Sequence, residues 1–201
     1  MTIIGITGGT GAGKTTALDV LKDRGALTLD CDAIYHELLD TNADMKDAIN
    51  ARFPGVIENG VLDRKALGKL VFSDEKALSD LNAIAHAFVC DETVRRIDEF
   101  ESRGGTLAAI DAIALFESGL SELCDKTVAV TAPAGERARR IMAREGIGME
   151  YAMLRINAQK SDDYYKASCD YVLINDCESY EEFHKKCGVF FDAILGGLKN
   201  V

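Results

Sequence analysis

The sequence predicts an α/β fold in which a mostly parallel β-sheet lies between two layers of helices. Short apolar runs alternate along the chain with longer segments of helical periodicity, and this alternation is typical of parallel strands joined by right-handed crossovers. The 201 residues include only two prolines, and no linker rich in Gly, Ser or Pro divides them. We therefore expect one domain that spans residues 1–201.

Five runs rich in β-branched and small apolar residues are the candidate strands. Their composition is that of strands buried on both faces of a sheet. They are residues 3–7, 26–29, 106–111, 126–131 and 171–174. These runs place the sheet-forming core of the fold in residues 1–32 and 105–201.

Segments with apolar residues at helical spacing separate these strands. The first helix is predicted for residues 14–24 and stops at Gly25. The block 33–104 is mainly helical and has the character of a substrate-binding region beside the sheet. Its predicted helices are residues 33–39, 43–53, 63–72 and 75–102, and the later ones are 134–144, 149–159 and 180–198.

The net charge and the apolar pattern exclude two classes of partner. The formal net charge is −10, and an acidic surface of this size repels a nucleic acid backbone. No apolar run approaches the ~20 residues that a membrane helix needs, and the chain begins without a signal-type segment. We therefore expect a cytoplasmic protein with no nucleic acid or membrane partner.

A glycine-rich loop between the first strand and the first helix matches the P-loop pattern. Gly8 and Gly13 allow backbone conformations that a Cβ would obstruct, so successive N–H groups can converge on a phosphate. Lys14 supplies charge to the β- and γ-phosphates, and the Thr15 hydroxyl suits Mg²⁺. The loop predicts binding of ATP with Mg²⁺ by Gly8, Gly9, Thr10, Gly11, Ala12, Gly13, Lys14, Thr15 and Thr16. The alternative is a glycine-rich turn that happens to contain Lys-Thr.

Two carboxylates are expected at the carboxyl ends of strands, where open α/β sheets bind ligands. Asp32 follows the strand 26–29 and is suited to accept a hydroxyl proton or to orient Mg²⁺. Its alternative role is to cap the helix 33–39. Asp111 ends the strand 106–111 in a Walker-B-like position, where it can hold Mg²⁺ through water. Its alternative is a solvated aspartate in a loop.

Four arginines fall within two turns of the helix 134–144. Arg137, Arg140 and Arg144 are spaced to share one face, whereas Arg139 falls outside that spacing. In an acidic chain this concentration of positive charge favours an anionic ligand, and a guanidinium can stabilise a transferring phosphoryl group. The alternative is a solvated basic face.

The sequence resembles the dephospho-coenzyme A kinase family over nearly its whole length. The resemblance covers residues 6–16, the Asp-x-Asp element at 30–32, residues 60–68, 71–74, 81–86 and 115–117, Arg140 and Arg144, residues 158–159 and 170–175. It departs from the family at Ala87 and Ile113, where prolines are usual, and at Arg137, where a glutamine is usual.

The resemblance implies a three-layer α/β/α P-loop kinase fold with a helical acceptor-binding region, about 33–104, and a lid, about 134–160. It implies transfer of the ATP γ-phosphoryl group to the ribose 3′-hydroxyl of dephospho-coenzyme A, the last step of coenzyme A biosynthesis. The small-molecule acceptor would be bound by Asp32, Arg64, His86, Asp111 and Glu117.

By the same resemblance, Lys14, Asp32 and Arg140 would be catalytic, and Arg144 and Asn175 would help to bind ATP. We expect a monomer or a weak homo-oligomer. Two alternatives to this function are another small-molecule or nucleotide kinase of the same fold and a non-catalytic ATP-dependent regulatory module.

Overall fold

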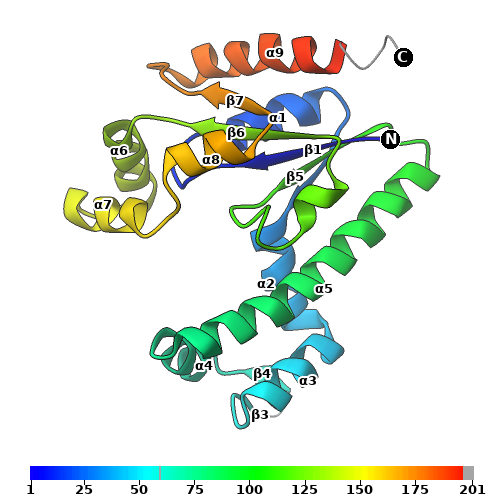
Figure 1. Cartoon of the computed structure of the whole chain (residues 1–201), viewed down its shortest axis with the longest axis vertical. Helices are drawn as coiled ribbons and strands as arrows, with labels where there is room; N and C mark the ends of the chain where they lie inside the picture. Colours follow the sequence, from blue (N-terminus) through cyan, green and yellow to red (C-terminus); the bar gives the residue numbers. More distant parts are fainter. Residues whose placement is uncertain (59, 197–201) are drawn as a thin grey trace.

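The computed structural model describes residues 1–58 and 60–196, and its centre is a five-stranded parallel sheet (Figure 1). The strand order is β2-β5-β1-β6-β7, and each neighbouring pair is parallel. The strands are β1 (Thr2–Thr7), β2 (Leu27–Asp30), β5 (Leu107–Asp111), β6 (Lys126–Thr131) and β7 (Tyr171–Ile174). The predicted mostly parallel sheet is therefore confirmed.

Helices cover both faces of the sheet, which gives the predicted three layers. On one face α1 (Lys14–Asp23) and α9 (Tyr180–Gly196) pack over Ile4 and Ile6, both fully buried. On the other face α2 (Cys31–Thr41) and α5 (Glu75–Ser102) pack over Ala108 and Ile110. Complete burial of a side chain such as Ile6 contributes about 1.5–3 kcal/mol. The closing helix was predicted to reach residue 198, and residues 197 and 198 lie outside the described residues.

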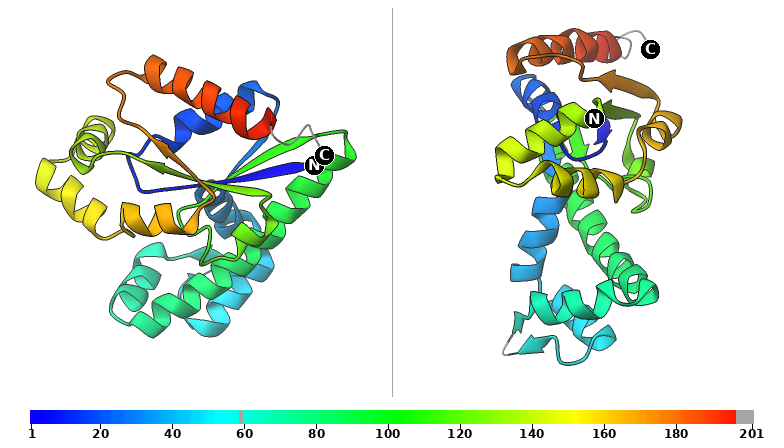
Figure 2. Two further views of the ribbon diagram at one scale, coloured as in Figure 1. Left: turned by 45° about the horizontal axis from the view of Figure 1, so that its top comes forward. Right: turned by 90° about the vertical axis from the view of Figure 1, so that its left-hand side faces the viewer.

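A mainly helical region projects from this second face, as Figures 1 and 2 show. It contains α3 (Ala43–Arg52), α4 (Arg64–Phe72) and most of α2 and α5. One apolar cluster runs from Ile110 on the sheet through Val89 to Met45 and Leu67 in this region. A short hairpin of β3 (Ile57–Glu58) and β4 (Val61–Leu62) also lies here and was not predicted.

The starts of several helices are fixed by side chains that accept a backbone N–H in the first turn. These caps are Asp30 for α2, Asn42 for α3, Asp63 for α4, Asp74 for α5 and Ser161 for α8 (Asp162–Ser168). Such a cap is typically worth about 1 kcal/mol. The helix predicted for residues 33–39 thus begins two residues earlier, because Asp30 accepts from the Ala33 N–H at 3.0 Å.

The predicted lid segment forms a helical hairpin at one end of the sheet (Figure 1). It consists of α6 (Ala134–Glu145) and α7 (Met149–Asn157), which share a small apolar cluster around Ile141 and Ile156. The chain then forms α8, which the sequence did not predict, and a 3₁₀ helix (Leu120–Leu123) was also missed. Across the described residues, we find no helix of the length and apolar character that a bilayer crossing requires.

Candidate active site

A cleft of about 380 Å³ opens at the carboxyl edge of the sheet. The ends of β1, β2 and β5 all contribute to it, as expected for parallel strands that point the same way. Its lining consists of Gly9, Thr10, Gly11, Ala12, Gly13, Lys14, Thr15, Asp30, Asp32, Asp111, Ile113, Arg140, Arg144 and Arg155. Most of the predicted nucleotide-binding residues therefore face one space.

The loop between β1 and α1 has the geometry of an anion site. Gly13 precedes α1 with φ of 109° and makes no side-chain cap. The Thr16 N–H donates to the Gly13 carbonyl at 3.1 Å, whereas the N–H groups of Lys14 and Thr15 remain available to a phosphate. A Cβ on Gly13 would overlap the side-chain amide of Asn175, and one on Gly8, where φ is 136°, would overlap the carbonyl oxygen of Val130. Both glycines of the motif are thus required by the surrounding structure.

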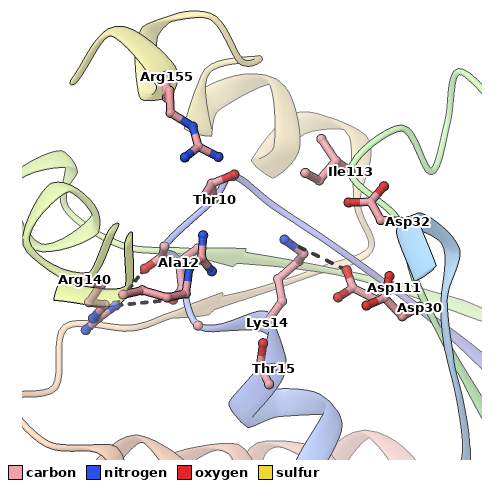
Figure 3. Close-up of a pocket in the computed structure, with 14 residues that line it drawn as sticks. Thr10, Ala12, Lys14, Thr15, Asp30, Asp32, Asp111, Ile113, Arg140 and Arg155 are labelled. Carbon is pink, nitrogen blue, oxygen red and sulfur yellow. Dashed lines mark hydrogen bonds and ion pairs between the residues drawn. The ribbon is translucent and has the colours of Figure 1, made fainter. Parts of the chain in front are cut away.

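Lys14 folds back over this loop. Its Nζ donates to the carbonyl oxygen of Gly8 at 3.0 Å and lies 3.9 Å from Oδ1 of Asp111. The Lys14 side chain is 13% exposed and that of Asp111 is 15% exposed. The ammonium group is therefore held within the cleft, where a bound polyphosphate can attract it away from Asp111 (Figure 3).

Asp111 lies among other carboxylates. It is the last residue of β5, and Asp30 at the end of β2 is its direct neighbour in the sheet register. Burial raises the pKa of the Asp111 carboxyl to about 6, the Lys14 ammonium offsets part of this change, and the charges of Asp30 and Asp32 add to it. The alternative of a solvated loop aspartate is wrong for this residue.

Oxygen donors of the kind that Mg²⁺ prefers line this part of the cleft. The Thr15 hydroxyl and the Asp111 carboxylate both face it, and a divalent cation would relieve the accumulation of negative charge around Asp111. Among the described residues, no group of three or more His, Cys, Asp or Glu is placed to hold a metal ion. This donor set fits a cation that is bound jointly by the protein and by substrate phosphates.

Asp32 lies in the first turn of α2, two residues after the end of β2. Its side chain is exposed and accepts no hydrogen bond from the described part of the chain. The alternative that it caps this helix is wrong, because Asp30 is the cap. A free carboxylate at this point is available to a ligand in the cleft.

A second cavity of about 220 Å³ adjoins the cleft, since Asp32 and Ile113 line both spaces. Its wall also includes Tyr35 and Asn82, together with His86 from α5. Burial lowers the pKa of His86, although the charge of Glu117 opposes this effect. The lowered pKa favours the neutral imidazole, which can donate a hydrogen bond to an uncharged ligand group and accept one from it.

Other predicted site residues line neither space. Arg64 lies on the surface of α4, where it donates to Asp40 at 3.0 Å, and Glu117 accepts from the Tyr164 hydroxyl at 3.0 Å. Asn175 is 4% exposed and lies behind the loop, where its amide donates to the carbonyl oxygen of Ala12 at 2.9 Å. Gly8 and Thr16 also lie outside the lining of the cleft.

The arginines of the lid are placed differently from one another. Arg140 lines the cleft but donates to the Gly11 carbonyl at 3.2 Å and to Oδ1 of Asn175 at 3.1 Å. Arg144 also lines it and pairs with Glu145. Arg137 is 3% exposed and lies beneath the loop, so the prediction that it shares a ligand-facing surface with the other two is wrong.

Arg155 is a cleft residue that sequence reasoning missed. It extends from α7 toward Thr10 (Figure 3) and pairs with the same Glu145 that holds Arg144. A usable signal was present, because Arg155 is the single basic residue of the predicted lid helix 149–159. Folding of α7 against α6 brings its guanidinium over the loop.

A phosphate loop with a lysine, a free carboxylate beside it and arginines on a neighbouring helical hairpin define a P-loop kinase. The family model described as dephospho-CoA kinase matches residues 2–181. A dephospho-CoA kinase from Brucella melitensis is 31% identical over 196 residues, covering 98% of this chain and 96% of that protein. The chain belongs to the dephospho-CoA kinase family.

Solved structures share the fold of this chain. TT1252 from Thermus thermophilus is 33% identical and has a TM-score of 0.76, covering 98% of this chain and 97% of its own. A dephospho-CoA kinase from Campylobacter jejuni has a TM-score of 0.67 and covers 97% of this chain and 98% of its own. At 24% identity, the second likeness concerns the fold.

The family assignment confirms several expectations from the sequence. The protein is a kinase with a nucleotide-binding P-loop fold, and its reaction is ATP-dependent phosphorylation of the small molecule dephospho-coenzyme A in coenzyme A biosynthesis. The expectations of a cytoplasmic protein and of a monomer or weak homo-oligomer stay predictions.

Proposed function

We propose that Asp32 accepts the proton of the ribose 3′-hydroxyl of dephospho-coenzyme A while Lys14 stabilises the transferring γ-phosphoryl group of ATP. The position of Asp32 carries this proposal, because it lines both the phosphate cleft and the adjoining cavity. A nucleophile seated in that cavity meets the phosphoryl donor beside a free carboxylate. General base catalysis of this kind is typically worth 10²–10⁴-fold in rate.

The phosphate groups of ATP are bound by the loop from Gly8 to Thr15. The N–H groups at the start of α1 and the Lys14 ammonium provide the positive field, and they are fixed before the reaction begins. Without nucleotide, the Lys14 ammonium lies 3.9 Å from the Asp111 carboxylate. As negative charge spreads over the γ-phosphoryl oxygens, the ammonium moves from Asp111 to these oxygens. This exchange costs little reorganisation, because both positions lie within the same cleft.

Mg²⁺ is the metal that best fits the donor set of Thr15 and Asp111. The Thr15 hydroxyl and the Asp111 carboxylate would hold the ion, and it would neutralise part of the charge of the phosphates. Asp111 also keeps Lys14 oriented in the absence of nucleotide.

The acceptor is assigned to the cavity between the sheet and the helical region of residues 33–104. Its wall combines apolar Val89 and Leu120 with Tyr35, Asn82 and His86, a mixture that suits an aromatic base and a ribose. We assign Arg64 and Glu117 to the outer part of the acceptor site. Arg64 is close enough to Tyr35, and Glu117 to His86, for its charge to affect the pKa of that wall residue. The lid, about residues 134–160, supplies Arg140, Arg144 and Arg155 from the opposite side.

A comparison of two Asp→Asn variants tests the role of Asp32. Asp32→Asn should lower kcat by at least ~10²-fold with little change in the KM for ATP. Asp30→Asn is the matched control: it removes a charge at the same strand edge while asparagine preserves the helix cap, so its loss should be much smaller. Equal losses in the two variants, or a purely thermal defect in Asp32→Asn, would reject Asp32 as the base.

A further inference from the structure

Arg137 is a buried arginine whose guanidinium is held by three hydrogen bonds to the phosphate loop and to residues of the lid and of the start of α8. Its side chain is 4% exposed, and its three nitrogens each find a different partner. Nε donates to the carbonyl oxygen of Thr10 at 3.0 Å, one terminal nitrogen to Oδ1 of Asp162 at 3.1 Å, and the other to Oε1 of Gln159 at 3.0 Å. A buried charge held in this way has a single low-energy position.

These contacts hold Thr10 at the tip of the phosphate loop. Thr10 uses all of its polar groups: its carbonyl accepts from Arg137, its N–H donates to Oε1 of Gln159 at 2.9 Å, and its hydroxyl accepts from Nε2 of Gln159 at 2.7 Å. The Thr10 N–H therefore points away from the phosphate site. Side chains from outside the motif therefore help to fix the conformation of the loop.

The same contacts connect the phosphate loop with the lid and with α8, which follows the lid. Arg137 belongs to α6, Gln159 follows α7, and Asp162 begins α8. We propose that Arg137 is a positioning residue that fixes the shape of the phosphate loop through Thr10 and links that shape to the position of the lid. This inference rests on the assignment of the loop as the ATP site, although it does not depend on Asp32 or on the identity of the acceptor.

Gly9 gives independent support, because the P-loop pattern does not require glycine at this position. Its backbone lies outside the left-handed region, so alanine is conformationally permitted there. A Cβ on Gly9, however, would overlap the Arg137 guanidinium, whose position is fixed by three hydrogen bonds. The Arg137 guanidinium therefore occupies space that only a residue without a Cβ leaves open at position 9.

A double-mutant cycle between Gly9→Ala and Arg137→Ala tests this contact. The measured quantity is the Kd for ADP in the presence of Mg²⁺, determined by calorimetry. In the wild-type background, Gly9→Ala should weaken ADP binding by at least ~10-fold, because the new methyl group displaces either the loop or the guanidinium. In the Arg137→Ala background the same change should cost less than ~3-fold, since its obstacle is gone. Arg137→Ala alone should weaken binding by ~10-fold or more, a KM-type effect that a loss of stability alone does not produce.

Arg139→Ala is the matched control for this cycle. Arg139 lies two residues away on the same helix, is 71% exposed and pairs with Glu136, so its removal should leave ADP affinity unchanged. If Arg137→Ala does not fold, Arg137→Gln replaces it in the cycle, because the shorter amide also vacates the space beside Gly9. Asp162→Asn, which neutralises a partner that is 30% exposed, should weaken ADP binding in the same direction.

Two outcomes would overturn the positioning role of Arg137, and both can be distinguished from a wrong assignment of the nucleotide site. Equal costs of Gly9→Ala with and without the arginine would show that Arg137 does not shape the loop. An unchanged Kd in Arg137→Ala or Arg137→Gln, with only a lower melting temperature, would reduce Arg137 to a stabilising residue. Absence of ADP binding by the wild-type protein would instead reject the assignment of the loop as the nucleotide site.

Discussion

Asp111→Asn should stabilise the nucleotide-free protein while it abolishes efficient phosphoryl transfer. The carboxyl has an ordinary pKa of 3.8, which burial and the neighbouring Asp30 and Asp32 raise to about 6 in the folded protein, even though Lys14 lies 3.9 Å away. Holding the ionised form in the fold therefore costs on the order of 3 kcal/mol above pH 6. Asparagine has nearly the same shape and carries no charge, so it avoids this cost.

The pH dependence has a definite sign. Because the folded-state pKa is raised, the folded protein binds the proton more tightly than the unfolded chain does. The stability that this group contributes is fully present below about pH 4 and is lost as the pH rises through about 6. The difference between variant and wild type should thus be close to zero at pH 4 and greatest at pH 8, where it corresponds to about 6–12 °C in Tm for a chain of this size.

Urea unfolding of the two proteins without nucleotide, at pH 4, 6 and 8, measures this difference directly. Addition of ATP with Mg²⁺ at pH 8 should narrow the gap, because the wild-type site gains more from the ligand. A variant that is less stable than wild type at pH 8 would show that the ion pair with Lys14 outweighs the cost of burial. The accumulated negative charge in the cleft would then not destabilise the folded protein.

Two further substitutions test the phosphate-binding groups. Lys14→Ala should abolish phosphoryl transfer and leave the far-UV circular dichroism spectrum unchanged, because the ammonium acts on the nucleotide; near-wild-type turnover in a folded variant would contradict this role. Arg140→Lys should lower kcat/KM by at least ~10-fold, since an ammonium cannot reproduce the contacts of a planar guanidinium with the Gly11 carbonyl and Asn175; equal activity of the lysine variant would remove Arg140 from the site.

Sequence reasoning located the sheet and the phosphate loop because both depend on local patterns. The five strands are short apolar runs, and the glycines at 8 and 13 together with Lys14 follow from the needs of a bound phosphate. Helix α8 was missed because its seven residues, 162–168, are mostly polar and show no apolar face. The two-residue strands β3 and β4 are too short to have any periodicity.

The side chains of the cleft were predictable to the extent that topology alone determines their position. Asp32 and Asp111 meet because the carboxyl ends of parallel strands share one edge of the sheet. Spacing along α6 placed Arg137 and Arg140 on one face of the helix. It could not show that Arg137 is buried under the phosphate loop. Arg155 reaches the cleft only because α7 folds back against α6, which is a tertiary arrangement.

Acceptor selectivity distinguishes dephospho-coenzyme A from the acceptors of other small-molecule kinases. Purified protein with saturating ATP and Mg²⁺ should be supplied with dephospho-coenzyme A, adenosine, AMP or shikimate, and kcat/KM should be measured for each from ADP release and product mass. We predict that dephospho-coenzyme A is used far better than the other three, because the distant parts of the acceptor contribute binding energy that orients the ribose hydroxyl toward Asp32. A higher kcat/KM for adenosine, AMP or shikimate would contradict the assignment of the cavity around His86 to this acceptor.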